Sequence, residues 1–136
     1  MLSGVNLSKI PLRENLPGLL GILEFSELDF VPKRLYWLSN IPHGSSRGRH
    51  AHKTLQQVFI LIQGSVTIEI SKGPISHDYR MTTKGEILTI PPKLWREIRE
   101  SSADAIILVV CDQPYNESDY IRDYEEYIRW YKCDAK

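Results

Sequence analysis

Short runs of alternating apolar and polar residues recur along most of the chain, and alternation with a period of two predicts β-strands. The clearest example is VTIEI at 66–70, which follows the apolar stretch LQQVFILI at 55–62. A continuous apolar run over 105–110 predicts a central strand buried on both faces. Glycine and proline between the runs predict turns. Strands are predicted at 34–38, 54–62, 65–71, 76–81, 86–90, 95–99 and 105–110.

The two ends of the chain follow other patterns. Residues 1–18 contain Pro11 and Pro17 and show little periodicity, which predicts an irregular arm or short edge strands. Residues 19–30 fit either a strand or a short helix, and the strand-like runs that follow favour a strand. Residues 116–132 carry apolar side chains at helical spacing and predict a helix. Its tyrosines, Tyr120 among them, are expected to pack rather than to line a site.

Together these elements predict a single all-β domain over residues 1–136. Its parts are an N-terminal arm at 1–18, a sandwich or barrel at 19–111 and a short C-terminal α-helix at 116–132. Many short strands separated by turns are typical of antiparallel sandwiches and barrels, and a jelly roll is the favoured version.

Charge and composition narrow the class of partner. Lysine plus arginine number 17 and aspartate plus glutamate number 17, so no overall field attracts nucleic acid or an anionic membrane. The longest apolar run, at 105–111, is too short to span a membrane. The N-terminus lacks the pattern of a secretion signal, and Cys111 and Cys133 are expected to be free thiols. These features predict a cytoplasmic protein.

Two histidines carry the candidate chemistry. His50 and His52 stand two positions apart, so a strand would place both imidazoles on one face. A loop rich in glycine, serine and proline at 39–48 leads into them, and such loops often carry functional side chains. The pair could bind a metal, transfer protons or have only a structural role. Neutral imidazole can take or give a proton near physiological pH.

The residues around the pair resemble the cupin motifs. Metal-binding cupins have a glutamate at the position of Gln57 and a final histidine at the position of Arg96. Glutamine is a weak neutral ligand and arginine cannot bind a cation, so we expect no metal and favour proton transfer next to a carbonyl. A metal-dependent cupin of the dioxygenase type is the alternative. The matching positions are Gly44, His50, His52, Gln57 and Gly64 in the first motif, and Gly85, Pro91 and Arg96 in the second.

A longer resemblance covers most of the chain. The segments RLYWL (34–38), RGRHAHKTLQQ (47–57) and YNESDYIRDYEEYI (115–128) resemble the sugar nucleotide 3,4-ketoisomerases, the WxcM-like branch of the cupins. This resemblance implies an RmlC-like cupin jelly roll, a homodimer and no metal or other cofactor. It also implies a dTDP-4-keto-6-deoxyhexose substrate, such as dTDP-4-keto-6-deoxyglucose, used in deoxysugar and polysaccharide biosynthesis. Pairing with a second subunit would also cover exposed strand edges.

The same resemblance implies His50, His52 and Tyr36 as catalytic residues. They would move the carbonyl from C4 to C3 of the sugar through an enediol or enediolate, with His50 as the base. Two other functions stay open at this point. One is a 3,5-epimerase acting on a similar 4-keto sugar, and the other is a cupin that binds nucleotide sugars without catalysis.

Substrate-binding residues are predicted from the chemistry of a nucleoside diphosphate. Its charge needs cations, for which Arg47, Arg49, Arg96 and Lys53 are the candidates. Arg49 ranks below Arg47, because it alternates away from the histidine face. Thymine needs an aromatic wall, for which Trp95 is a candidate. Gln57 completes the predicted set. Members of the resembled family often have a histidine at the position of Arg96, so the role of this arginine stays open.

Overall fold

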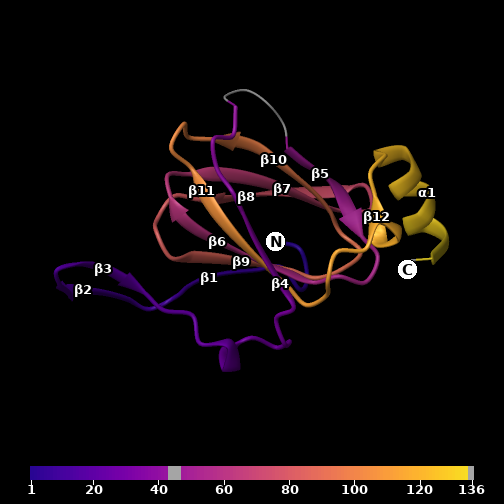
Figure 1. The fold of residues 1–136 in the computed structure, drawn as a ribbon. Coiled ribbons are helices and arrows are strands. Elements are labelled where there is room, and N and C mark those ends of the chain that lie inside the picture. The colour runs from indigo at the N-terminus through magenta and orange to yellow at the C-terminus, as the bar shows by residue number, and fades with distance from the viewer. Residues whose placement is uncertain (43–46, 135–136) are drawn as a thin grey trace.

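The computed structural model describes residues 1–42 and 47–134, without the side chains of Asn15, Leu16 and Arg47. Two five-stranded antiparallel sheets pack face to face, and a helix closes one end of the molecule (Figure 1). This arrangement confirms the predicted all-β sandwich with a C-terminal helix. Sheet one has the order β1 (Asn6–Lys9), β9 (Glu86–Ile90), β6 (Gln57–Gln63), β11 (Ile106–Cys111) and β4 (Arg34–Leu38). Sheet two has the order β12 (Tyr120–Ile121), β5 (Arg47–His52), β10 (Trp95–Ser101), β7 (Val66–Lys72) and β8 (Ile75–Met81).

The main core lies between the two sheets and follows the period of two in the sequence. Phe59 and Leu61 of β6 face Ile68 and Ile70 of β7, and all four side chains are buried. Because neighbouring residues point to opposite faces, a slip of one residue would move this whole set to the wrong side. The alternation therefore fixes which side chains enter the sandwich.

The outer face of sheet one is covered by the segment between the N-terminal hairpin and β4. Leu23, Leu28 and Phe30 pack there in a cluster with the buried Val58 and Ile60 of β6. The predicted strand at 19–30 is therefore wrong beyond Gly21, because these apolar residues cover a sheet instead of joining one. The segment contains η1 (Phe25–Glu27), and the hairpin consists of β2 (Leu12–Leu16) and β3 (Gly18–Gly21).

The C-terminal helix α1 (Tyr124–Asp134) lies at one end of the molecule, where Tyr127 packs with Ala51 and Trp95 on the outer side of sheet two. It begins at Tyr124 and not at Asn116 as predicted, because the preceding residues make other bonds. The Asn116 side chain accepts from the Ser118 N–H in η2 (Glu117–Asp119), and Ile121 of β12 then pairs with Ala51 of β5. The acidic start that suggested a helix instead brings residues 119 and 120 next to the histidines.

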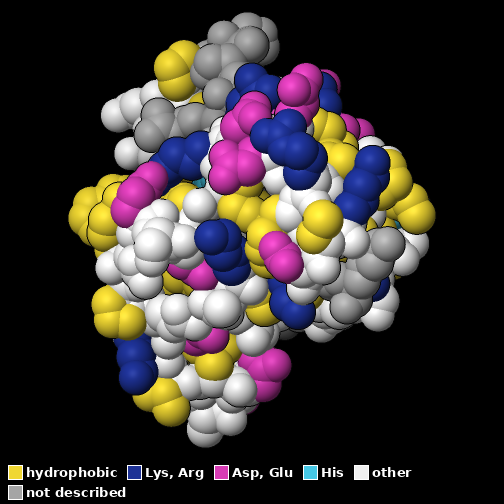
Figure 2. Space-filling model, turned by 90° about the vertical axis from the view of Figure 1, so that its right-hand side faces the viewer, with side chains coloured by type: hydrophobic (Ala, Val, Ile, Leu, Met, Phe, Trp, Pro, Cys, Tyr) yellow, Lys and Arg dark blue, Asp and Glu magenta, His cyan; other side chains and the backbone are white. Residues whose placement is uncertain are grey.

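Charged side chains of both signs are mixed on the face that carries α1, where Figure 2 shows lysine and arginine among aspartate and glutamate. This mixture agrees with the zero formal net charge of the chain. No helix in the described ranges 1–42 and 47–134 is long and apolar enough to cross a membrane.

Candidate active site

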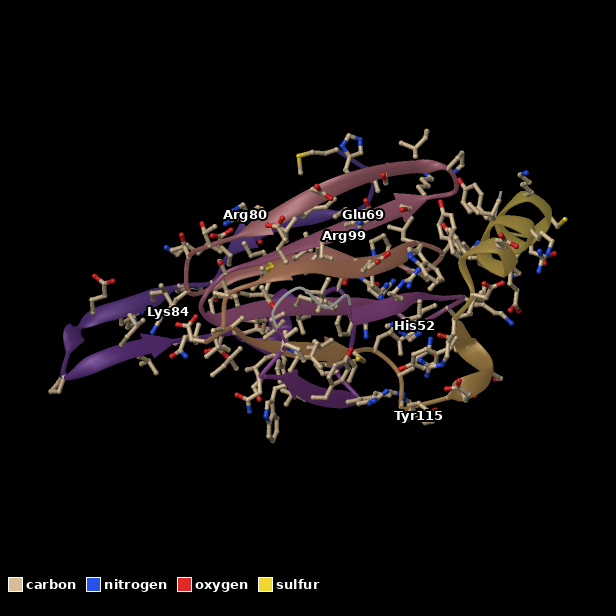
Figure 3. The ribbon with its side chains drawn as sticks, turned by 90° about the horizontal axis from the view of Figure 1, so that it is seen from above. His52, Glu69, Arg80, Lys84, Arg99 and Tyr115 are labelled. Carbon is tan, nitrogen blue, oxygen red and sulfur yellow. The ribbon has the colours of Figure 1, made fainter. Side chains whose placement is uncertain are left out.

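The two histidines lie inside the sandwich, on the inner face of β5, as the spacing predicts. His50 is the cross-strand partner of Arg96 on β10, so these two side chains share that face. Ala51 and its partner Trp95 point to the opposite face, under α1. Figure 3 shows His52 and Tyr115 toward the end of the molecule that carries α1, far from Lys84 near the hairpin.

The imidazoles of His50 and His52 contact each other directly. Their Nε2 atoms are 3.1 Å apart and the rings are nearly perpendicular, at 87°. His52 is completely buried, whereas His50 is partly exposed. Of the two, His50 is therefore the one that a bound molecule can reach.

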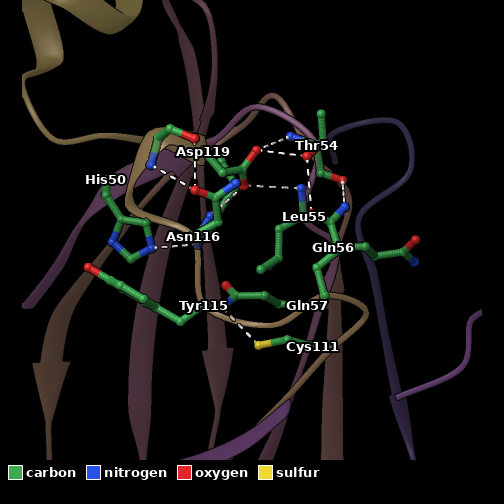
Figure 4. A network of polar contacts seen from close by, with 12 residues as sticks. His50, Thr54, Leu55, Gln56, Gln57, Cys111, Tyr115, Asn116 and Asp119 are labelled. Carbon is green, nitrogen blue, oxygen red and sulfur yellow. Dashed lines mark hydrogen bonds and ion pairs between the residues drawn. The ribbon is translucent and has the colours of Figure 1, made fainter. Parts of the chain in front are cut away.

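Asp119 holds the second nitrogen of His52. Its Oδ2 lies 3.1 Å from His52 Nδ1, and the carboxylate also accepts from the Thr54 N–H at 2.8 Å, the Thr54 hydroxyl at 2.7 Å and the Leu55 N–H at 3.3 Å (Figure 4). These bonds explain why β6 begins at Gln57 rather than at the predicted residue 54. They also fix a carboxylate that is only 6% exposed beside a buried imidazole.

This carboxylate determines which nitrogen of each imidazole carries the proton. An ionised carboxylate only accepts, so Nδ1 of His52 carries a proton and Nε2 of neutral His52 is an acceptor. His50 must then donate from Nε2, which leaves the lone pair of its Nδ1 free. Burial first, and the Arg96 guanidinium second, lower the pKa of both histidines well below 6.5. Both rings are therefore neutral at pH 7, and Nδ1 of His50 is the available base.

The lowered pKa of His50 predicts a loss of stability in acid. Below about pH 6.5 the unfolded chain takes up a proton at His50 that the folded chain does not, so the free energy of unfolding falls by up to about 1.4 kcal/mol per pH unit. Above that pH the group contributes no slope. Urea unfolding at about pH 7.5 and about pH 5.5 should therefore show a larger fall for wild type than for His50→Asn. Equal falls would contradict this assignment.

Tyr120 forms an aromatic wall against both imidazoles. Its ring centroid lies 5.0 Å from that of His50 and 4.4 Å from that of His52. The guanidinium of Arg122 also stacks on the Tyr120 ring, with its carbon 4.1 Å from the ring centroid. Arg122 is in turn held by two hydrogen bonds that it donates to Glu117, at 2.7 and 2.8 Å. The expectation that Tyr120 only packs in a helix is therefore wrong, because β12 places it at the histidines.

Sheet one supplies the opposite wall through Tyr36 of β4 and Gln57 of β6. Gln57 Nε2 donates to the Tyr36 hydroxyl at 3.1 Å, and the Arg96 guanidinium donates to Gln57 Oε1. Arg96 is 1% exposed and also donates to the Leu94 carbonyl at 3.1 Å. Burial raises the pKa of Tyr36 to about 12 and lowers the pKa of Arg96 to about 10. At neutral pH the phenol is protonated and the guanidinium is charged.

The structure does not place three of the predicted binding residues, Trp95, Lys53 and Arg47, against the histidine pair. Trp95 is 2% exposed and packs edge-on against Tyr124 under α1, so it cannot form a wall for thymine beside the histidines, and that prediction is wrong. Lys53 follows β5 and donates its backbone N–H to the Asp119 carbonyl at 3.0 Å. Its ammonium group stays a predicted phosphate contact. Gly44 and the side chain of Arg47 lie outside the described residues.

Two further site residues, Asp119 and Arg34, were not among the predicted ones. Asp119 is separated from His52 by 67 positions, and its surroundings suggested the start of a helix. Arg34 shares the inner face of β4 with Tyr36, a signal already present in the alternation of RLYWL. Its guanidinium carbon lies 5.0 Å from the ring centroid of Tyr36 and 5.2 Å from that of Tyr115. Its buried Nη1 has no hydrogen-bond partner among the described residues.

The side chains at the cupin ligand positions do not fit a metal ion. Arg96 occupies one position as a cation, and it donates to the Gln57 amide oxygen that would have to act as a ligand. Within residues 1–42 and 47–134, no three or more histidine, cysteine, aspartate and glutamate side chains are grouped to hold a metal. The arrangement instead suits proton transfer between a neutral imidazole pair and a bound molecule.

A two-sheet sandwich with a histidine pair on its inner face, and with Gln57 and Arg96 at the ligand positions, defines a cupin-type protein with an acid–base site. The chain belongs to the WxcM-like, C-terminal family (FdtA), whose model matches residues 3–132.

Similar proteins cover nearly the whole chain. The TDP-4-oxo-6-deoxy-alpha-D-glucose-3,4-oxoisomerase of Aneurinibacillus thermoaerophilus is 30% identical over 113 residues, which are 83% of this chain and 81% of the relative. The crystal structure of QdtA, a sugar 3,4-ketoisomerase from Thermoanaerobacterium thermosaccharolyticum in complex with TDP, is 32% identical, with a TM-score of 0.91 over 97% of each chain. A histidine-to-asparagine mutant of QdtA in complex with TDP-4-keto-6-deoxyglucose is 31% identical, with a TM-score of 0.91 over 98% of each chain.

Proposed function

We propose that this protein is a sugar nucleotide 3,4-ketoisomerase that acts on TDP-4-keto-6-deoxyglucose. The observation that carries the proposal is the chain Asp119–His52–His50, which leaves one neutral nitrogen available as a base. The relatives are 3,4-ketoisomerases, and QdtA and its mutant bind TDP and TDP-4-keto-6-deoxyglucose respectively. The family membership and the base therefore support the same reaction.

The carbon chemistry begins at the proton on C3, which the neighbouring 4-keto group makes acidic. His50 removes it through Nδ1, and the electron pair forms the C3–C4 double bond of an enediolate. The imidazolium that results is stabilised because its Nε2 proton can pass to His52, whose other nitrogen faces the Asp119 carboxylate. His50 then delivers a proton from Nδ1 to C4, and because His50 is partly exposed this proton can exchange with solvent while the imidazole holds it. General acid–base catalysis of this kind contributes about 10²–10⁴-fold to the rate.

The oxygen chemistry completes the reaction. The oxygen on C4 gains a proton and the hydroxyl on C3 loses one, so the carbonyl moves to C3 without a net change in oxidation state. Tyr36 is the group proposed to carry this proton between the oxygens, because His52 is completely buried and both of its ring nitrogens are bonded to His50 and Asp119. Neither step needs a redox cofactor, and the predicted absence of one stays part of the proposal.

Arg34 is proposed as a cation for the diphosphate of the substrate, in addition to Arg47 and Lys53. Its Nη1 is buried and lacks a hydrogen-bond partner among the described residues, while Tyr36 and Tyr115 hold the guanidinium in place. A buried N–H group without a hydrogen-bond partner is costly, and a phosphate oxygen would supply that partner.

Replacing Arg34 with methionine should therefore weaken the binding of TDP by about 10–100-fold, the equivalent of about 1.5–3 kcal/mol for a charged hydrogen bond. Titration calorimetry measures the Kd. Arg80→Met is the matched control, because Arg80 is exposed and its guanidinium bonds Thr67 and Glu100 of sheet two, outside the proposed site. An unchanged Kd for Arg34→Met would remove this residue from the proposed site.

A homodimer is also part of the proposal. β4 is an edge strand, and its outward side chains Leu35 and Trp37 are 52% and 64% exposed. An apolar edge of this kind is normally covered, and a second copy would cover it.

Proton NMR of the products tests the proposed activity. Incubation with TDP-4-keto-6-deoxyglucose should give a product whose carbonyl is at C3, and in deuterium oxide its C4 position should gain deuterium. A product that keeps its carbonyl at C4 and is inverted at C5 would indicate a 3,5-epimerase instead. Binding of the nucleotide sugar without any turnover or exchange would indicate a non-catalytic protein.

A further inference from the structure

Arg96, Gln57 and Tyr36 form a chain of hydrogen bonds that connects the two sheets. Arg96 comes from β10 in sheet two, whereas Gln57 and Tyr36 come from β6 and β4 in sheet one. The guanidinium donates to Gln57 Oε1, and Gln57 Nε2 lies 3.1 Å from the Tyr36 hydroxyl oxygen. Arg96 and Gln57 are both 1% exposed, so water cannot replace either bond.

The chain has only one consistent direction. A guanidinium has no acceptor, so the amide oxygen of Gln57 must face Arg96 and its NH₂ group must face Tyr36. An NH₂ group cannot accept, so the phenolic oxygen receives this bond and cannot return its own proton along it. Among the described residues, no acceptor lies within hydrogen-bonding distance of the Tyr36 proton. The proton of Tyr36 is therefore available to a bound molecule.

We propose that Gln57 and Arg96 are positioning residues that fix the Tyr36 hydroxyl as a hydrogen-bond donor to the oxygen at C4 of the sugar. This inference rests on the proposed function. In the reaction the negative charge of the enediolate develops on that oxygen, and a donor held in place before the charge forms lowers the barrier. Neither Gln57 nor Arg96 needs to touch the substrate for this effect.

Two features of the site agree with this assignment. Burial raises the pKa of Tyr36 to about 12, so the phenol keeps its proton at neutral pH and can act as a donor. Gln57 and Arg96 also stand at the two positions where metal-binding cupins carry ligands. The glutamine and the arginine at these positions then have the same role, which is to direct the Tyr36 hydroxyl proton toward the substrate.

The substitution Gln57→Glu reverses this direction with almost no change in shape. A carboxylate at position 57 still accepts from Arg96, so the buried guanidinium keeps its partner and the fold is expected to persist. The same carboxylate also accepts from Tyr36 and draws the phenolic proton away from the substrate. We expect kcat to fall by about 10²–10³-fold, the usual effect of losing one donor to a developing oxyanion. KM should change by less than about threefold, because the loss is confined to the transition state.

Two comparisons separate this effect from a structural one. Gln63→Glu is the matched control, since Gln63 ends the same strand and its amide bonds the Asp104 carbonyl at an exposed position. Its kcat should equal that of wild type. In a Tyr36→Phe background, Gln57→Glu should cause no further fall in kcat, because Gln57 acts through the phenol. All assays contain a chelator, because a glutamate at position 57 restores a cupin metal ligand.

The possible results distinguish a failure of the positioning role of Gln57 and Arg96 from a failure of the proposed isomerase activity. Wild-type kcat for Gln57→Glu, or a loss that is equally large in the wild-type and the Tyr36→Phe backgrounds, would overturn the inference while the proposed function stands. A wild-type protein that does not convert TDP-4-keto-6-deoxyglucose would overturn the proposed function and this inference with it. A loss that appears only when Tyr36 is present would support both.

Discussion

Replacing His50 with asparagine is expected to stop the exchange of the substrate's C3 proton with solvent and to lower kcat by about 10²–10⁴-fold. His50 is the partly exposed member of the imidazole pair, whereas His52 is completely buried. The free lone pair on His50 Nδ1 exists because Asp119 fixes the tautomer of His52. Asparagine has a similar size near the backbone and can bond to His52, but its amide is not a base at neutral pH.

Deuterium incorporation at C3 and C4, followed by NMR, measures this effect independently of product release. His77→Asn is the control, because His77 is exposed on β8 and lies outside the imidazole pair. The His50→Asn variant should still bind TDP, since the proposed diphosphate contacts do not include His50. Exchange at the wild-type rate in His50→Asn would show that another group is the base and that the mechanism proposed for this site is incorrect.

The sequence was sufficient for those features of the fold that depend on nearest neighbours. The strands at 34–38 and 86–90 have the predicted bounds, because alternation along a strand is a local property. The shared face of His50 and His52 follows from their spacing in the same way. The alternation of side chains along a strand could also have excluded Trp95 from the site, since the residue next to Arg96 must point to the opposite face of β10. Its aromatic character alone was a weaker guide than its position.

Features that depend on distant partners could not be obtained in this way. Asp119 accepts from Thr54, Leu55 and His52, all more than sixty positions earlier in the chain. These bonds delay the start of β6, and the pairing of β12 with β5 delays the start of the helix. A local pattern records the preference of a segment and not the partner that satisfies its backbone. Asp119, which fixes the tautomer of the histidine pair, could therefore not be identified from the sequence.

The second large effect is expected for Asp119→Asn, which should lower kcat by about 10²–10⁴-fold although Asp119 does not touch the substrate. The carboxylate keeps the proton of His52 on Nδ1, whereas the NH₂ group of asparagine would donate to that nitrogen and move the proton to Nε2. His52 would then donate to Nε2 of His50 and leave the proton of His50 on Nδ1, where the base is needed. One change of an acceptor to a donor therefore blocks a nitrogen two hydrogen bonds away.

Stability must be separated from catalysis in this variant, because the carboxylate also accepts from the backbone of Thr54 and Leu55. Loss of one such bond should cost about 1–3 kcal/mol of unfolding free energy. Asp112→Asn is the matched control, since Asp112 accepts from the Gln56 N–H at 3.0 Å and does not contact a histidine. It should lose stability and keep its kcat. Nitrogen-15 NMR of the imidazoles reports the tautomer directly, and an unchanged tautomer of His52 with full activity in Asp119→Asn would refute the proposed chain.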